Sequence, residues 1–590
     1  MPSISATRCV APLPKTFAAL KQAIASTTYQ SATEASEALG YLLNSSSPIF
    51  SANLGDLIDR DLCGVGHHFE NKFRVQASFP ALDAAVTGWG KHKNHDGHET
   101  FVTKLLPSIC EQACRYPDLI PKGMVDTVGP SLPSDSPDRL RKFTKDQLHC
   151  LLCNAFLCTF RRLSNNCASL ALQLSEDADE NINIHAIQCP MPSCNYDELL
   201  AGPPDNVHIS KLEMILCYFD TMRIRSEEQK QKKNGCEDGE SVAGASSSSP
   251  VTLIIARGKA DPYVRLADPT HPNTKSNMPL LPVTMHPLRH SIDDLRDAIR
   301  VDFANKIIGG AVSYGNVQEE ITFALCPELH VSRIMFECMA VDEAIVLVGA
   351  EQFALLKPGT YGGSMRCAGY PPNQPAELSS SKTSVIVAVD ALDFRHHRAT
   401  RQFSCEGFER EINKLAAGLK FPIDQFIVEL QNGSPPTTTC TATDTASNNN
   451  AENQNQQQLV SPQGFRSNVV ATGNWGCGVF RGDVMLKTIL QWLCCSIYGK
   501  EMHYFPFDRD DIFEMGSLMN ALIQQRGSGG GGGGATVADL EGFLAVLEES
   551  MRGGEGEGKR SRDHQQPPTR RFIIELFKSH FKLKNVSCKE

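Results

Sequence analysis

The chain has 590 residues, of which 41% are hydrophobic and 21% are charged, and its formal net charge is −10. These values are typical of a soluble globular protein, and the length allows more than one domain. The negative charge argues against nucleic-acid binding through a basic surface. The sequence has no apolar run of membrane-spanning length, so we expect no membrane association.

The 21 cysteines are dispersed along the chain, and no secretory apolar segment precedes them. We therefore expect reduced, mostly buried thiols in an intracellular protein. Cys150 and Cys153 have ligand-like spacing, as do Cys189 and Cys194, but neither pair has a matching second pair. The sequence therefore predicts no zinc site.

A second group of possible ligands lies in the polar segment KHKNHDGHE. It consists of His92, His95, Asp96 and His98. Because the segment is polar and precedes a helical pattern, we interpret it as a solvated turn rather than a metal site.

The first 225 residues are predicted to be helical, because apolar residues recur at helical spacing, for example over 101–109 and 148–156. A short helix is also expected at 17–24, and others at 153–162 and 211–219. Residues 226–250 are charged and then rich in serine, so we predict a disordered linker there.

Beyond this linker, apolar runs predict five strands, at residues 251–256, 301–303, 345–348, 385–389 and 467–472. A helical pattern at 410–419 falls between two of them. This alternation predicts a mixed α/β sheet with helices on both faces. Three low-complexity segments are predicted to be disordered surface inserts, near 432–460, 527–534 and 553–570.

Residues 301–329 combine a strand, a glycine turn and the start of a helix. The glycines are Gly309-Gly310, and Gln318-Glu319-Glu320 stands where the helix begins. A helix start has unpaired N–H groups that accept carboxylates and phosphates, and glycines let a substrate lie against the backbone. The arrangement suits glycosidic chemistry on a phosphate-bearing sugar.

Residues 471–493 run from a strand through a glycine-rich loop into a helix. Gly473, Gly476 and Gly478 permit a loop whose amides converge on an anion. The loop has neither the P-loop pattern nor the dinucleotide fingerprint.

Both stretches resemble motifs of the poly(ADP-ribose) glycohydrolase family. The first carries Asp302-Phe303-Ala304-Asn305 ahead of the glycines and the Gln-Glu-Glu triplet, and the second carries Asn474-Trp475-Gly476-Cys477-Gly478. Further matches follow in the family's order at 349–353, 389–394, 410–414 and 504–507. The resemblance spans roughly residues 90–590.

The resemblance implies a macrodomain-like α/β fold at 251–590, preceded by a helical accessory region at 1–225 and the linker at 226–250. It implies hydrolysis of the ribose–ribose O-glycosidic bonds of poly(ADP-ribose), mainly from the free end, with release of ADP-ribose and without a metal or other cofactor. The implied partners are poly(ADP-ribose) and poly(ADP-ribosyl)ated proteins. We expect a monomer, no direct nucleic-acid binding, and a nuclear or cytoplasmic location.

Carried over by position, the implied catalytic acids are Asp302, Glu319 and Glu320. We expect Glu320 to act as general acid and then base, Glu319 to hold ribose hydroxyls, and Asp302 to position the loop and the glutamates. The implied substrate-binding residues are Ile292, Asp293, Asn305, Gln318, Tyr361, Asn474, Trp475, Gly476, Cys477, Gly478, Val479, Phe480 and Phe507.

Three places depart from the family pattern. Ala311 replaces a glycine, which would cost of order 1 kcal/mol if its φ were positive. Arg481 also replaces a glycine and can pair with phosphate or point to solvent. The loop at 357–363 is longer, which can displace Tyr361. The main alternative is therefore a macrodomain-like reader that binds ADP-ribose without hydrolysis. An NAD-dependent oxidoreductase is disfavoured by the missing fingerprint.

Overall fold

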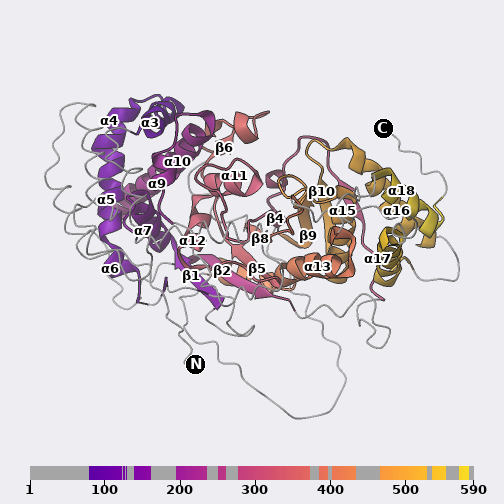
Figure 1. Cartoon of the computed structure of the whole chain (residues 1–590). Coiled ribbons are helices and arrows are strands. Elements are labelled where there is room, and N and C mark those ends of the chain that lie inside the picture. Colours follow the sequence, from indigo (N-terminus) through magenta and orange to yellow (C-terminus); the bar gives the residue numbers. More distant parts are fainter. Residues whose placement is uncertain are drawn as a thin grey trace, which may run out of the picture.

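The computed structural model describes residues 79–122, 124–125, 128, 139–160, 194–234, 250–260, 277–372, 384–395, 401–432, 465–527, 534–552 and 570–583. A mixed sheet lies at the centre, with the N-terminal helices at one end and the C-terminal helices at the other (Figure 1). The predicted helix at 17–24 and nearly all of the three predicted inserts lie outside the described residues.

The sheet has eight strands in the order β1-β2-β5-β8-β4-β9-β10-β3. Their bounds are β1 (Leu140–Thr144), β2 (Val251–Lys259), β3 (Val283–Met285), β4 (Ala298–Asp302), β5 (Glu343–Val348), β8 (Val385–Ala388), β9 (Arg466–Gly473) and β10 (Glu501–Phe505). Strands β8, β4, β9, β10 and β3 run parallel, whereas β1, β2 and β5 pair antiparallel. The five predicted strands and the mixed α/β fold are confirmed.

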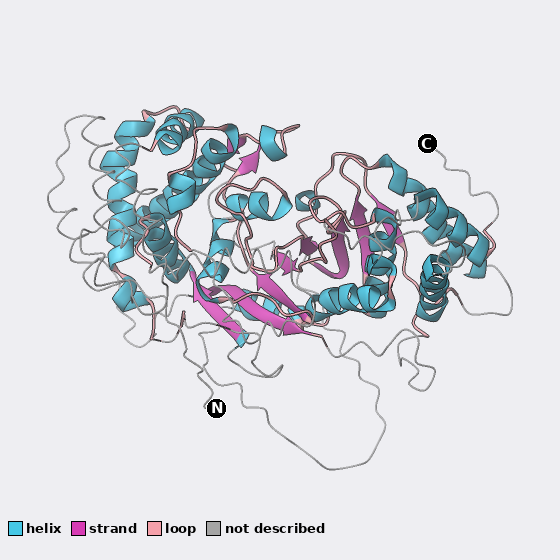
Figure 2. Cartoon of the chain, viewed as in Figure 1, coloured by secondary structure: helices cyan, strands magenta, loops and turns pink. Residues whose placement is uncertain are grey.

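Alternating strand residues face two apolar cores. Figure 2 shows helices on both sides of the strands. In β2, Leu253 and Ile255 belong to one core and Ile254 to the other. The first core packs against α3 (Pro80–His92), α5 (Leu106–Cys114), α7 (Lys145–Phe156), α10 (Asn206–Asn234), α11 (Gln318–Leu325) and α12 (Ser332–Met335). The second packs against α13 (Cys405–Leu419), α14 (Ile423–Asn432), α15 (Val484–Ile497), α16 (Phe513–Gly527), α17 (Val537–Arg552) and α18 (Arg570–Phe581).

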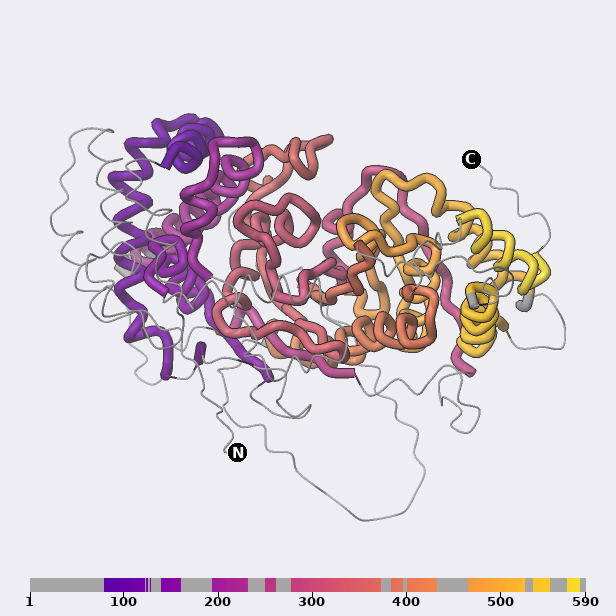
Figure 3. Tube along the Cα trace, in the orientation of Figure 1, coloured from indigo at the N-terminus to yellow at the C-terminus, as the bar shows by residue number. Residues whose placement is uncertain are grey.

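Short elements complete the described fold: α4 (Gly97–Thr100), η2 (Phe101–Leu105), α6 (Tyr116–Leu119), α9 (Asp197–Leu200), η5 (Ile292–Asp294), η6 (Pro327–Val331), β6 (Leu355–Leu356), η7 (Gly362–Ser364), β7 (Cys367–Gly369), η8 (Arg401–Phe403) and η9 (Asp510–Ile512). The chain trace in Figure 3 shows the N-terminal helices packed beside the middle of the chain. Among the described helices, none combines the length and apolar character needed to cross a membrane.

The structure corrects three local predictions. Helix α10 continues to Asn234, so the start of the predicted linker at 226–250 is helical. The Glu, Gln and Lys residues of this segment favour helix. Arg223 also forms an ion pair with Glu227, one turn later, at 2.9 Å. Helix α7 ends at Phe156 instead of continuing toward 162, and Cys158 follows with a φ of 54°. Strand β1 lies inside the region predicted to be helical.

Strand β1 joins that region to the sheet as its edge. Its residues pair antiparallel with β2, beginning with Leu140 opposite Ala256. Just before it, Arg139 donates to the Glu343 carboxylate at 2.8 Å, and Arg257 donates to the other oxygen at 2.5 Å. All three side chains are buried, so the helical region is attached through the interior of the sheet.

Candidate active site

The predicted site residues gather where the parallel strands β4, β9 and β10 end. These strands are neighbours in the sheet, and their last residues are Asp302, Gly473 and Phe505. In α/β sheets, ligands bind in the crevice outside the carboxyl ends of the strands. The sequence of β4 therefore places Asp302 at that edge, and α11 begins beside it (Figure 1).

The first turn of α11 is fixed to the end of β4 by Gln318. Its side-chain oxygen accepts from the Phe303 N–H at 2.8 Å, and its side-chain nitrogen donates to the Val301 carbonyl at 3.4 Å. One oxygen of Glu320 accepts from the Val317 N–H at 3.0 Å, and the other accepts from the Ala311 N–H at 3.3 Å. The helix start is thus tied to both ends of the loop that precedes it.

Glu319 organises the same loop from the inside. Its two oxygens accept from the N–H groups of Asn305, at 2.9 Å, and Gly309, at 2.6 Å. A Cβ on Gly310, whose φ is +39°, would lie 2.8 Å from the Glu319 carboxylate. The Asn305 side chain accepts from the Ile307 N–H at 3.0 Å. These contacts give Glu319 the loop-positioning role that we expected of Asp302.

Asp302 is buried, and its two carboxyl oxygens have no hydrogen-bond partner among the described residues. Burial raises the pKa of Asp302 well above its usual value, and the neighbouring Glu320 and Asp293 carboxylates add to the effect. Burial also raises the pKa of Glu319, with further contributions from Asp302 and Glu320, although the amides of Asn305 and Gly309 oppose it. Asp302 and Glu319 therefore retain their protons to higher pH than isolated carboxylic acids do.

Two buried cations, which the sequence analysis missed, hold the outer part of this loop. Arg333 donates to the carbonyls of Ile308 at 3.1 Å and Gly310 at 3.2 Å. Lys211, on α10, donates to the carbonyls of Val312 at 2.8 Å and Gly315. Burial lowers the pKa of Lys211 to about 8. A lysine in an apolar helix is normally interpreted as a surface residue, so no signal in the sequence distinguished Lys211 from an exposed lysine.

Ala311 stands where the family has glycine, and its backbone conformation is one that alanine adopts without strain. Its φ is not among the positive values found in the described residues, so the position does not require glycine. Arg481, by contrast, has a φ of 57° and an exposed side chain. The family's glycine preference thus has a backbone reason at 481 but not at 311.

The two predicted aromatic contacts lie together. The rings of Tyr361 and Phe507 have centroids 4.8 Å apart. Burial raises the pKa of Tyr361, as do the nearby carboxylates of Asp293, Glu320 and Asp302, so this ring is close to the acid cluster despite its longer loop.

Two other predicted substrate contacts, Ile292 and Asp293, are both held by neighbouring residues. The Asp293 carboxylate accepts from Arg300 at 2.9 Å. Ile292 is buried against Ala471 and Phe505 in a small apolar cluster.

The loop after β9 contains both interior and exposed residues. Trp475 is fully buried and donates to the Val389 carbonyl at 3.0 Å, so any contact of this residue with a ligand would come from its backbone. The Asn474 side chain donates to the Pro506 carbonyl at 2.8 Å and accepts from the Tyr504 hydroxyl at 2.9 Å. Both residues therefore anchor the loop to the sheet.

The tip of the loop is open. A Cβ on Gly478 would meet nothing within 4 Å, whereas one on Gly476, whose φ is +71°, would lie 2.5 Å from Ala391. Cys477 and Phe480 are partly buried, and Val479 is 54% exposed. The Asp483 carboxylate caps α15 by accepting from the Leu486 N–H at 2.9 Å, so one amide of that helix start is already occupied.

The fold and the site define a macrodomain-like α/β protein with an attached helical region and a buried acid cluster at the carboxyl ends of its parallel strands. Residues 271–514 match the family model described as "Poly (ADP-ribose) glycohydrolase (PARG), Macro domain fold". Residues 94–236 match the one described as "Poly (ADP-ribose) glycohydrolase (PARG), helical domain". The two models together cover more than half of the chain, which belongs to the poly(ADP-ribose) glycohydrolase family.

Individual proteins that carry the family's name also match this chain. The chain is 32% identical over 237 residues to "Probable poly(ADP-ribose) glycohydrolase 2" of Arabidopsis thaliana, covering 39% of this chain and 43% of the relative. It is 33% identical over 252 residues to "Poly(ADP-ribose) glycohydrolase 1" of the same plant, covering 38% and 45%. "Poly(ADP-ribose) glycohydrolase 1" of Caenorhabditis elegans is 27% identical over 232 residues, with 38% and 24% covered. The matches thus span less than half the length of these relatives.

Proposed function

We propose that this protein hydrolyses the ribose–ribose O-glycosidic bonds of poly(ADP-ribose) and releases ADP-ribose, mainly from the free end of the polymer. The observation that carries the proposal is the packing of Asp302, Glu319 and Glu320 beneath one loop at the carboxyl ends of the parallel strands. A reader domain needs loops that bind ADP-ribose, but it does not need three buried acids whose mutual repulsion is costly.

Glu320 is the proposed general acid. Of its two backbone contacts, the one to Ala311, at 3.3 Å, is the longer, which leaves that oxygen the more available to a substrate. Glu320 donates a proton to the departing 2′-oxygen as the C–O bond to the neighbouring ribose breaks, and the carboxylate then takes a proton from the attacking water. Glu319 holds the loop in shape while its remaining lone pairs meet ribose hydroxyls.

The surrounding residues support recognition of one terminal ADP-ribose unit. The Tyr361–Phe507 pair offers aromatic surface for the adenosine end. The open tip at residues 476–480 offers backbone amides for the diphosphate. On this basis, the partners are poly(ADP-ribose) and the proteins that carry it. Because the substrate is an anion and the chain has a net charge of −10, the electrostatic potential at the binding site must be locally favourable to negative charge.

The test is release of ADP-ribose from purified polymer by the full chain and by Glu320→Gln. The variant keeps shape but cannot transfer the proton, so kcat should fall by roughly 10²–10⁴ while calorimetric affinity for ADP-ribose stays within a few-fold. Glu501→Gln makes the same change at an exposed position and should behave as wild type. Near-normal turnover by Glu320→Gln would contradict the mechanism.

The product time course tests the free-end preference. Monomeric ADP-ribose should be the released product from the first turnover, while each polymer shortens by one unit at a time. Early accumulation of oligomers would instead show internal cleavage. A wild-type protein that binds ADP-ribose but releases none from the polymer would identify a reader.

A further inference from the structure

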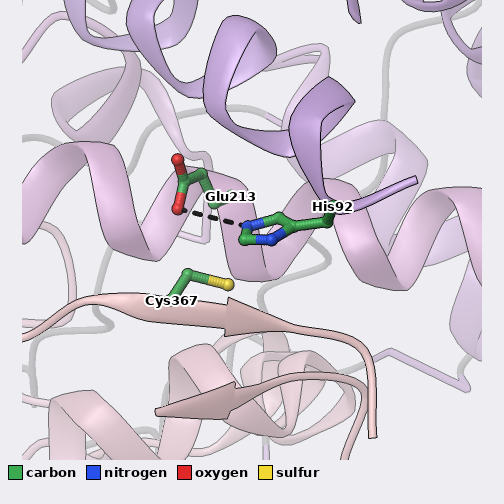
Figure 4. Close-up of side chains that lie close together, drawn as sticks. All are labelled: His92, Glu213 and Cys367. Atoms are coloured by element: carbon green, nitrogen blue, oxygen red, sulfur yellow. Dashed lines mark ion pairs between the residues drawn. The ribbon is translucent and has the colours of Figure 1, made fainter. Parts of the chain in front are cut away.

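A second cluster of chemically active side chains lies away from the acids. His92 is the last residue of α3, Glu213 lies on α10, and Cys367 is the first residue of β7. Their possible ligand atoms lie within 4.8 Å of one another, and His92 Nε2 is 3.7 Å from Glu213 Oε2. Figure 4 shows the three side chains pointing toward a common centre.

Cys217 supplies a fourth donor. It follows Glu213 by one helical turn on α10, so both side chains lie on the same face of that helix. Its thiol contacts the thiol of Cys367, and both cysteines are free. The cluster therefore combines an imidazole, a carboxylate and two thiols from three elements that are distant in the sequence.

Two details favour a ligand at this centre. His92 Nε2 is buried and has no hydrogen-bond partner within the described part of the chain. The Gly369 N–H donates to the Cys367 sulfur at 3.3 Å, as amides commonly do for sulfur that carries negative charge. The thiolate is the form of cysteine that binds metals.

We propose that His92, Glu213, Cys217 and Cys367 bind a structural metal ion of the Zn²⁺ type. Zinc takes tetrahedral nitrogen, sulfur and oxygen ligands at about 2.0–2.3 Å, so its donors lie roughly 3–4 Å apart, which small side-chain rotations achieve here. Thiolates disfavour Mg²⁺ and Ca²⁺. Four protein ligands leave no open position, which is the pattern of a structural site rather than a catalytic one. None of the four is a proposed catalytic acid, so the inference does not rest on the proposed function.

The metal would have a defined structural consequence. Cys367 begins β7, which pairs with β6, and the loop between these strands carries Tyr361. An ion at the cluster would fix this hairpin to α3 and α10. The helical region would thereby hold an aromatic residue of the proposed adenosine contact in place.

A proton is the competing occupant. Without a metal, a protonated His92 ring would pair with the Glu213 carboxylate, 3.7 Å away, and with a Cys367 thiolate in the same cluster. Metal binding must displace that proton. The experiment therefore has to distinguish a coordinated thiolate from an ion-paired one.

Cobalt provides the test, because Co²⁺ occupies zinc sites and absorbs light. The full chain, freed of any affinity tag, is stripped with a chelator and titrated with Co²⁺. We expect one equivalent to bind, with tetrahedral visible bands and a near-ultraviolet thiolate-to-cobalt band, and Zn²⁺ should abolish these bands. Their absence from the wild-type protein would overturn the proposal whatever the variants do.

Variants then assign the ligands. Cys367→Ser should abolish stoichiometric binding, and Cys217→Ser should lower the near-ultraviolet band by about half, because one of two thiolates is gone. Cys495→Ser, at another buried cysteine, should leave the spectrum unchanged. An unchanged band in Cys367→Ser overturns the site, and one in Cys217→Ser overturns the four-ligand assignment.

Alkylation separates metal from ion pair without any variant. Zn²⁺ should slow iodoacetamide labelling of Cys367 in the wild-type chain by at least about tenfold, because a coordinated sulfur is a poor nucleophile. The label is located by peptide mass spectrometry. Equal labelling with and without Zn²⁺ would exclude coordination of Cys367 and overturn the proposal.

Discussion

The two loops that form the proposed active site are stabilised in opposite ways. The loop between β4 and α11 is held by ionisable groups: the carboxylates of Glu319 and Glu320 accept from its amides, while Lys211 and Arg333 donate to its carbonyls. The loop after β9 is held mainly by neutral groups, chiefly the Trp475 indole and the Asn474 amide.

This difference matches the proposed tasks. A loop that handles protons has its shape coupled to the protonation of its own anchors, so pH and charge-removing substitutions should affect it strongly. A loop that receives a diphosphate benefits from anchors whose charge does not change. Substitutions in the two loops should therefore differ in their pH dependence as well as in size.

Trp475→Ala should produce the largest loss of stability, about 3–5 kcal/mol, because it empties a fully buried site. The loss should be similar at pH 6 and pH 8. Urea unfolding at the two values measures it. Trp475→Phe keeps most of the volume but leaves the Val389 carbonyl without its donor, so a smaller loss is expected. Full stability with lost ADP-ribose affinity would instead make the indole a substrate contact.

Lys211→Met should cost about 1–3 kcal/mol, because two loop carbonyls lose their buried donor. The reshaped loop should also lower kcat by more than it changes ADP-ribose affinity. Lys230→Met, at an exposed position on the same helix, should change neither quantity. Loss of stability with unchanged turnover would show that Lys211 has no positioning role.

Asp302→Asn should stabilise the protein at high pH by an amount of order 1 kcal/mol. In the folded chain the pKa of Asp302 is raised, so the folded state binds more protons than the unfolded state. Wild-type stability should therefore fall as pH rises from the ordinary carboxyl range toward the raised pKa. The asparagine of the variant cannot ionise. The free energy of unfolding of the variant should therefore exceed that of the wild type by more at pH 8 than at pH 5.

The measurement is the urea midpoint at both pH values, with Asp508→Asn as an exposed control at the same edge of the sheet. A stability difference between Asp302→Asn and wild type that does not change with pH would show that Asp302 has the same protonation in the folded and unfolded chains.

Arg481→Gly should have the smallest effect on stability, within about 1 kcal/mol. It relieves the left-handed backbone conformation, and the greater freedom of glycine in the unfolded chain offsets part of the gain. If the guanidinium pairs with the diphosphate, affinity for ADP-ribose falls by several-fold. Arg289→Gly, at another arginine with a φ of 66°, is the backbone control. Unchanged affinity in Arg481→Gly would place this side chain in solvent.

The sequence predicted the elements whose residues are buried in a regular pattern. Strands β4 and β5 are entirely buried, and their apolar runs were recognisable. Strand β1, LRKFT, was missed because only Phe143 of its residues is fully buried, as befits an edge strand. Within the acid cluster, a family resemblance identified the residues, but the division of roles between Asp302 and Glu319 depends on hydrogen bonds that no motif encodes.

The proposed metal centre was beyond sequence reasoning for a different reason. Metal-binding motifs are recognised by local spacing, and the possible ligands near His92 in the chain are His95, Asp96 and His98. The partners of His92 in the folded protein are Glu213 and Cys367, which the packing of α3, α10 and β7 brings together. A Glu-x3-Cys spacing on α10 was the one local signal available, and it is too common to be diagnostic.

The edge strand β1 has a consequence for how the chain can be divided. A truncated protein that begins at β2 would lose β1, exposing the hydrogen-bonding edge of β2 to other molecules, and edges of that kind promote aggregation. It would also lose Arg139, a buried partner of Glu343. The two regions recognised as separate family models are therefore expected to behave as one cooperative unit, and the macrodomain-like part should be produced only together with the residues that precede it.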